Sequence, residues 1–232
     1  MKYNLLIASV LISLLCVQCS KNNDQSSSGN VQYQLVTTNS TGSLGQVNSS
    51  NSNSLRVEGG TFSWTSGTGN VTELKFEAKS ATTEVEYKTK VKKGVNLFNT
   101  LSPLGGISVP PGTYDKVEFK IHFESADSIP ALELKGTYTN SAGVTTPIDL
   151  KIKSDVEFKF EKSTPTAIDG TSNYSALSSL ALNLLFSGVS ETMLNSATKD
   201  STGTIVISTT SNATLYKLMT GSIDKMLKVE IK

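Results

Sequence analysis

The chain has 232 residues, with 21 Lys and Arg, 20 Asp and Glu and a single His, giving a formal net charge of +1. This near-zero charge provides no electrostatic reason to bind nucleic acid, so we expect no nucleic-acid partner. The only two cysteines are Cys16 and Cys19. The rest of the chain therefore has no thiol for a disulfide or a thiolate metal site.

The first 18 residues have the pattern of a secretory signal. Lys2 precedes an apolar run over residues 5–17, which is shorter than the ~20 residues needed to span a bilayer. The run ends in Leu15-Cys16-Val17-Gln18-Cys19, which resembles the lipobox of bacterial lipoproteins, although Gln18 stands where Gly, Ala or Ser is usual. The resemblance implies removal of residues 1–18 and acylation of Cys19. An acylated Cys19 would anchor the chain to the outer membrane, facing the periplasm or the cell surface.

Polar segments divide the remainder of the chain. Residues 19–30 are too poor in apolar side chains to order themselves, so we expect a flexible tether. Residues 31–232 are then expected to form a single domain. Within it, the Ser- and Asn-rich segment at about residues 38–54 is predicted to be a long loop.

Alternation of apolar and charged side chains dominates the body of the chain. In residues 116–124, Val117, Phe119, Ile121 and Phe123 alternate with Lys, Glu and His. This period of two predicts an antiparallel strand with one face on a core. Similar patterns predict strands over 31–36, 73–79, 132–138, 148–153 and 156–161, and the more continuously apolar segment 177–186 predicts a central strand. We predict a mainly β fold, an antiparallel β-sandwich with Greek-key-like connections.

Turns and short helices complete the predicted domain. Pro110-Pro111-Gly112, Ser141-Ala142-Gly143 and Asp169-Gly170-Thr171 are typical of turns, as are Gly59-Gly60 and Gly105-Gly106. Two short helices are expected near the C-terminus, at residues 190–197 and 214–227, where apolar residues recur at helical spacing.

Several strings are similar to a group of uncharacterised Bacteroidota lipoproteins with β-sandwich domains. They are Phe62-Ser63-Trp64-Thr65-Ser66-Gly67, Leu74-Lys75-Phe76-Glu77-Ala78, Val95-Asn96-Leu97-Phe98, Pro110-Pro111-Gly112-Thr113-Tyr114 and Gly203-Thr204-Ile205-Val206-Ile207-Ser208. The resemblance implies a sandwich fold and an envelope location. It implies no catalytic residue.

The sequence contains few candidates for chemistry. His122, the only histidine, falls on the polar face of a predicted strand, so we expect an exposed strand residue rather than a general base. No nucleophile triad, metal-binding spacing or phosphate-binding loop is present, and no cofactor is expected. Trp64 has two interpretations: a ring in the core, or a platform for a glycan.

Two short motifs match the pattern of Bacteroidota O-glycosylation. They are Asp127-Ser128-Ile129 and Asp200-Ser201-Thr202, which make Ser128 and Ser201 the possible acceptors. Both lie in predicted loops, where an acceptor must be accessible.

The leading functional hypothesis is a non-enzymatic envelope lipoprotein that binds or adheres to a glycan or a protein. A fimbria-like structural subunit is a second hypothesis, because Arg56, the only arginine, follows the polar segment and offers a processing site. A glycan-active hydrolase is the third, because a pair of carboxylates can be brought together by folding.

Overall fold

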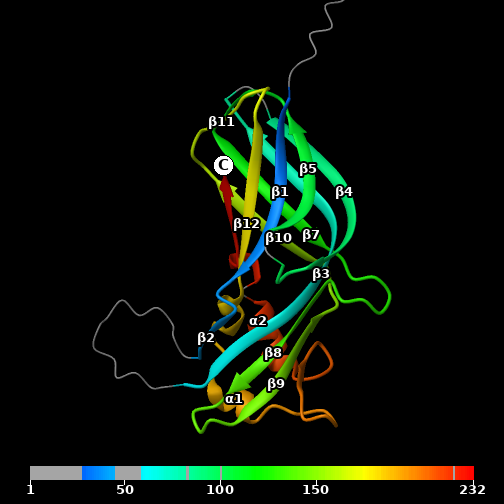
Figure 1. The fold of residues 1–232 in the computed structure, drawn as a ribbon, viewed down its shortest axis with the longest axis vertical. Coiled ribbons are helices and arrows are strands. Elements are labelled where there is room, and N and C mark those ends of the chain that lie inside the picture. Colours follow the sequence, from blue (N-terminus) through cyan, green and yellow to red (C-terminus); the bar gives the residue numbers. More distant parts are fainter. Residues whose placement is uncertain (1–27, 45–58, 82–83, 100, 222) are drawn as a thin grey trace, which may run out of the picture.

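The computed structural model describes residues 28–44, 59–81, 84–99, 101–221 and 223–232. Cys19, Arg56 and most of the predicted tether and long loop lie outside these residues. The predicted mainly β sandwich is confirmed, with two large sheets packed against each other (Figure 1). No helix among the described residues is long and apolar enough to cross a membrane.

The first sheet has four strands, in the order β14-β12-β1-β5. These are β14 (Leu227–Ile231), β12 (Asn173–Ala181), β1 (Gly29–Thr38) and β5 (Ser102–Val109). β1 runs parallel to β12 and antiparallel to β5, so a strand from the start of the chain lies in the middle of this sheet. Because β1 begins at Gly29, the tether predicted for residues 19–30 is wrong at its last two positions.

The second sheet has eight strands and is organised by β3 (Thr61–Lys79). At one end of the molecule its order is β4-β3-β7-β10, and at the other end it is β2-β3-β8-β9-β13. The other members are β2 (Thr41–Ser43), β4 (Glu84–Asn96), β7 (Lys116–Phe123), β8 (Leu132–Thr139), β9 (Thr145–Ile152), β10 (Val156–Lys162) and β13 (Ile205–Ile207). A separate pair consists of β6 (Gly112–Tyr114) and β11 (Thr166–Ile168).

Strands β7 and β8 follow one another along the same edge of β3. Asn70 connects them, because its N–H donates to the carbonyl of Ala131 at 3.0 Å and its carbonyl accepts from the N–H of Glu124 at 3.1 Å. Residues between β7 and β8 form a short projecting turn that contains Ser128. The strand predicted over residues 73–79 is the second part of β3, a strand of 19 residues that extends to both ends of the molecule.

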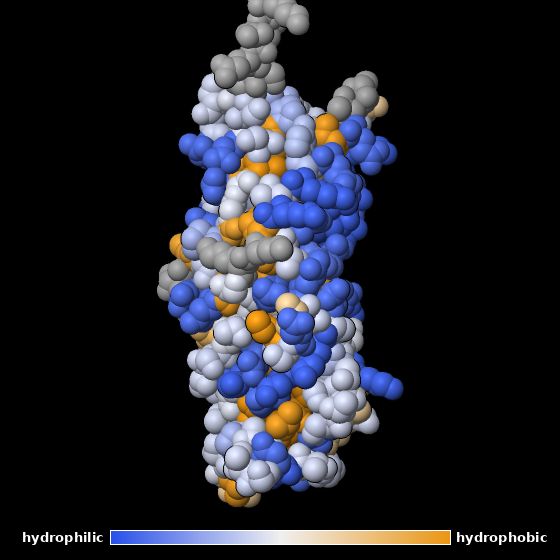
Figure 2. Space-filling view, turned by 90° about the vertical axis from the view of Figure 1, so that its right-hand side faces the viewer, coloured by the Kyte–Doolittle hydropathy of each residue, from blue (hydrophilic) through white to orange (hydrophobic). Residues whose placement is uncertain are grey.

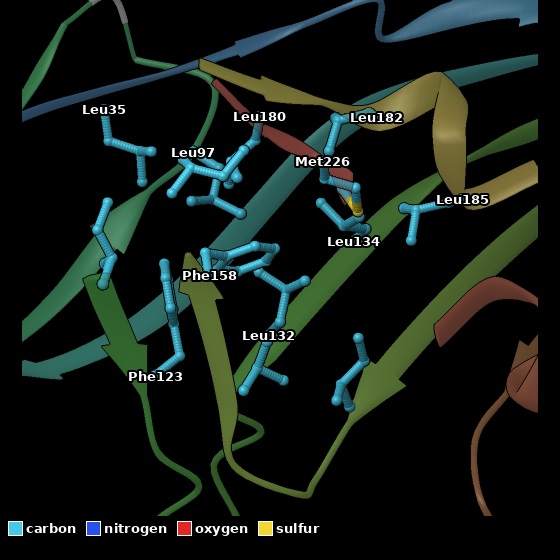
Figure 3. Close-up of a cluster of buried hydrophobic side chains, with 14 of the residues drawn as sticks. Leu35, Leu97, Phe123, Leu132, Leu134, Phe158, Leu180, Leu182, Leu185 and Met226 are labelled. Atoms are coloured by element: carbon cyan, nitrogen blue, oxygen red, sulfur yellow. The ribbon is translucent and has the colours of Figure 1, made fainter. Parts of the chain in front are cut away.

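The two ends of the eight-stranded sheet have different covers on their inner face. The four-stranded sheet covers one end, where the Tyr33 hydroxyl donates to the carbonyl of Lys75 at 2.8 Å. The other end is covered by η1 (Leu182–Phe186), α1 (Glu191–Asn195), α2 (Ala213–Thr220) and η2 (Ile223–Lys225). Figure 3 shows apolar side chains from both regions converging in one core.

Three local predictions of secondary structure are wrong. The apolar segment 177–186 is a strand only to Ala181 and then forms η1, because an uninterrupted apolar run fits either structure. The predicted helix at 214–227 ends at Thr220, and Leu227 begins β14. Gly105 and Gly106 lie within β5 rather than in a turn, beside a bulge in the ladder with β1.

Gly136 is required by the close approach of β8 to β3. A Cβ at this position would lie 2.2 Å from the carbonyl oxygen of Ser63 and 2.8 Å from the Cα of Trp64. Both are backbone atoms, which cannot move aside as a flexible side chain could. We therefore expect Gly136→Ala to lower the free energy of unfolding by about 2 kcal/mol or more.

Gly94 provides a matched control for this prediction. It also lies in a strand, but a Cβ there would meet no atom within 4 Å. Gly94→Ala should leave the midpoint of urea unfolding almost unchanged. Equal losses in the two variants would contradict the role given to Gly136.

Candidate functional site

The outer face of the eight-stranded sheet carries rows of charged side chains at one end and mainly hydroxyl side chains at the other. At the end formed by β4, β3, β7 and β10, it carries Lys and Glu side chains in rows. At the other end it carries Ser and Thr. We call these two regions the charged face and the hydroxyl face. Figure 2 shows the hydrophilic residues concentrated along one side of the upper half of the molecule.

Strand register arranges the charged face into rows of like charge. One row consists of Glu86, Glu77, Glu118 and Glu161, and the neighbouring row consists of Lys88, Lys75, Lys120 and Lys159. Each member lies directly opposite the next across the strand ladder. Like charges in this position are unfavourable, so the rows need compensation from elsewhere.

Ion pairs between the two rows supply that compensation. Along the strands, Lys120 pairs with Glu118 at 2.7 Å, Lys88 pairs with Glu86 at 2.8 Å, and Lys75 pairs with Glu77. Diagonal pairs then connect neighbouring strands. These are Lys75–Glu86 at 3.0 Å, Lys120–Glu77 at 3.0 Å and Lys159–Glu118 at 2.6 Å. Each of these three lysines thus contacts a carboxylate of the adjacent strand.

These ion pairs shift the pKa values of the charged face. Hydrogen bonds from Lys75 and then Lys120 lower the pKa of Glu77 to about 2. Burial acts to lower the pKa of Lys120, but the hydrogen bonds to Glu118 and Glu77 outweigh it and raise the pKa above its ordinary value. The charged forms of both residues are therefore stabilised by folding.

Glu118 is the most buried member of the charged face, with only 5% of its side chain exposed. It lies on the polar face of the strand predicted at residues 116–124, but Lys120 and Lys159 cover its carboxylate from two strands. His122 lies on the same face with 30% of its side chain exposed, and its Nε2 lies 3.4 Å from Glu124 Oε1. No nucleophile contacts it among the hydrogen bonds of the described residues.

The hydroxyl face is made of cross-strand pairs of Ser and Thr. Thr41 lies opposite Ser63, and Thr61 lies opposite both Ser43 and Thr139. Farther along, Thr137 lies opposite Ser63, and the hydroxyls of Thr139 and Thr145 are 2.9 Å apart. These side chains are exposed or half-buried, so they present an open, uncharged surface.

Asp149 lies where the hydroxyl face meets charged residues of β8 and β9. Burial raises its pKa, and its Oδ1 is buried without a hydrogen-bond partner. Its Oδ2 lies 3.1 Å from Lys151 Nζ, which also lies 3.7 Å from Glu133 Oε1. The two carboxylates thus share one lysine on an open sheet face. Among the described residues, no group of three His, Cys, Asp or Glu side chains could hold a metal ion.

Trp64 lies in the core, so its interpretation as a ligand contact is wrong. Only 2% of the residue is exposed, and its ring stacks on Phe186 with the centroids 5.6 Å apart. The pair of Phe186 and Phe62 stacks more closely, at 4.1 Å. No face of the indole remains for a glycan, because η1 covers it from the inner side of the sheet.

The two proposed glycosylation acceptors lie in exposed turns. Ser128 lies at the tip of the turn closed by Ala126 and Ile129, whose backbones are mutually hydrogen-bonded at 3.0 and 2.7 Å. Ser201 lies in a turn held by the Asp200 carboxylate, which accepts from the N–H groups of Thr202 and Thr204. Both serines are accessible, but the two sites are far apart in the chain and form no common site. Cys19 lies outside the described residues.

Glu118 offers a direct test of the charged face. In Glu118→Gln, Lys120 and Lys159 lose their shared carboxylate and are left as neighbouring positive charges. We expect the free energy of unfolding to fall by about 2 kcal/mol. The exposed Glu157 of the adjacent strand is the control. Glu157→Gln should change the free energy of unfolding by less than about 0.5 kcal/mol. A Glu118→Gln variant as stable as the native chain would contradict the pairing.

Acid should destabilise the protein through Glu77, Glu86 and Glu161, three carboxylates of the charged face. The folded-state pKa of Glu77 is about 2, against an ordinary value of 4.5, and ion pairs with lysines also lower the pKa values of Glu86 and Glu161. Carboxylates of lowered pKa stabilise the fold fully above their ordinary pKa, and this contribution is lost as the pH falls through the folded value.

We therefore expect the free energy of unfolding to decrease as the pH falls from 4.5 to about 2. Glu77→Gln should make that decrease shallower, because one of the linked protons is removed. Urea unfolding at a series of pH values measures this. An increase in stability over the same interval would contradict the electrostatic account.

Comparison with known proteins gives no match among protein-family models, curated proteins or solved structures.

Proposed function

We propose that this protein is a non-enzymatic lipoprotein of the cell envelope that acts in binding or adhesion. The observation that supports it most is the form of its polar surface. The Lys and Glu side chains are paired with one another over an open sheet face, and the hydroxyl face continues the same open surface. Open, extended faces suit a macromolecule or a second surface better than a small substrate, which binds in a concave site.

The proposed anchor is acylated Cys19, which would hold the protein on the outer membrane. β1 begins at Gly29 at one end of the elongated molecule, beside the charged end of the sheet, and the hydroxyl face lies toward the other end (Figure 1). An anchor preceding β1 would therefore leave the hydroxyl face directed away from the membrane. The ligand in this proposal is a glycan or a protein.

Anchoring is tested by replacing the acylated residue. We expect Cys19→Ala to abolish incorporation of labelled palmitate and to release the protein from the membrane fraction, while Cys16→Ala leaves both unchanged. Labelled palmitate in the Cys19→Ala variant would contradict the anchor.

Ligand binding is tested with the full chain in detergent on a glycan array and against envelope protein extracts. A ligand of the hydroxyl face should be lost in a Thr61→Glu, Thr139→Glu variant and kept in Lys79→Gln, which alters an exposed residue of the charged end. Turnover of an array glycan into shorter products would instead support the hydrolase hypothesis.

A fimbria-like subunit is the second candidate, favoured by the place of β1. This strand lies between β12 and β5 and buries Val31, Tyr33 and Leu35. Cleavage after Arg56 would separate it from β3 onward, and its removal would open a groove that a strand from another subunit could fill. If limited trypsin treatment removes β1 and the remaining chain stays monomeric, this candidate fails.

A further inference from the structure

We infer that β4 is an interface for a second copy of this chain, which pairs with it edge to edge in antiparallel orientation. Among the described residues, β4 forms a strand ladder with β3 alone, and β5 packs beside its C-terminal end, where Ser102 Oγ donates to the carbonyl of Asn96. Its opposite edge therefore presents backbone N–H and C=O groups that no strand pairs. Such an edge is a template for another strand unless the sequence prevents pairing.

The charges of β4 are self-complementary about Tyr87. Residues 84–90 read Glu-Val-Glu-Tyr-Lys-Thr-Lys, with the acidic residues on one side of Tyr87 and the basic ones on the other. When two copies pair antiparallel with Tyr87 opposite Tyr87, Glu84 lies opposite Lys90 and Glu86 lies opposite Lys88. All four outer-face positions then meet an opposite charge, which favours cross-strand pairing.

Within one chain the same residues are matched less well. Glu84 lies opposite Lys79 and Lys90 lies opposite Glu73, but Glu86 lies opposite Glu77 and Lys88 lies opposite Lys75, so only two of the four meet an opposite charge. The remaining edge strand of the charged face, β10, does not share the property. If the β10 strands of two copies paired antiparallel along their whole length, with Lys159 opposite Lys159, then Glu157 would lie opposite Glu161. The complementarity is thus specific to β4.

The inner face of β4 also gains from a second copy. Val85, Tyr87 and Val91 pack against the core but remain only half-buried at this edge of the sandwich. In the same register Val85 lies opposite Thr89, and the two Tyr87 rings lie side by side.

The symmetry of this contact determines how the two molecules are oriented. Antiparallel strands of one continuous sheet are related by a two-fold axis normal to the sheet, so the contact is isologous. The strands run roughly along the long axis of the molecule (Figure 1), so the two copies point in opposite directions.

Charge exchange tests the pairing independently of the anchor. The full chain in detergent is examined by analytical ultracentrifugation as three variants. Lys88→Glu with Lys90→Glu makes the edge wholly acidic, Glu84→Lys with Glu86→Lys makes it wholly basic, and the four changes together restore complementarity. We expect self-association in the native and fourfold-exchanged chains, and association at least tenfold weaker in each twofold variant alone.

Mixing the acidic and basic variants should restore association, which no general effect on folding explains. A native chain that stays monomeric at every concentration, twofold variants that associate like the native chain, or a mixture that stays monomeric would each overturn the pairing. Thermal unfolding of every variant verifies that it is folded.

Cysteine cross-linking tests the register. Directly opposite residues of antiparallel strands have Cα atoms about 4.5–5.5 Å apart, which suits a disulfide. In a Cys16→Ser, Cys19→Ser background, Tyr87→Cys should give a disulfide-linked dimer under mild oxidation. Thr89→Cys, whose opposite residue is Val85, should give far less. Equal cross-linking of the two would overturn the register.

Discussion

The strand β3 is hydrogen-bonded along both edges over most of its 19 residues, and the rest of the structure depends on it. One end of β3 pairs with β4 and β7, and the other end pairs with β2 and β8. Its bulges, at Thr65 and Thr72, allow the sheet to bend between these ends. A single strand thereby holds two differently covered regions in one sheet.

On the outer face of that sheet, strand register determines which charged side chains lie next to one another. In an isolated peptide, the alternating Lys and Glu side chains of each strand would have no fixed charged neighbours. The ladders align them into rows of like charge, and the diagonal ion pairs then offset the repulsion within each row. At the β4 edge the rows end without a further strand. The charge order there favours another copy of β4 as that strand.

Burial separates the residues that hold the fold from those that can meet a partner. Trp64 and Glu118 both looked available by residue type, and both are enclosed, one by Phe186 and the other by two lysines. The residues open to a partner are instead ordinary ones: the Ser and Thr side chains of the hydroxyl face and the charged side chains of β4. No motif distinguishes these positions in the sequence.

The sequence by itself determined the fold class and the strands with strict alternation, such as β7 and β10, because a period of two has one structural solution when one face is buried. It also determined both short helices, although not the end of the second. Only the tertiary structure decided that β1 pairs with β12, that residues 182–186 leave the strand, and which charges lie opposite one another. These features depend on contacts between segments far apart in the chain, and neither local propensity nor hydrophobic spacing contains them.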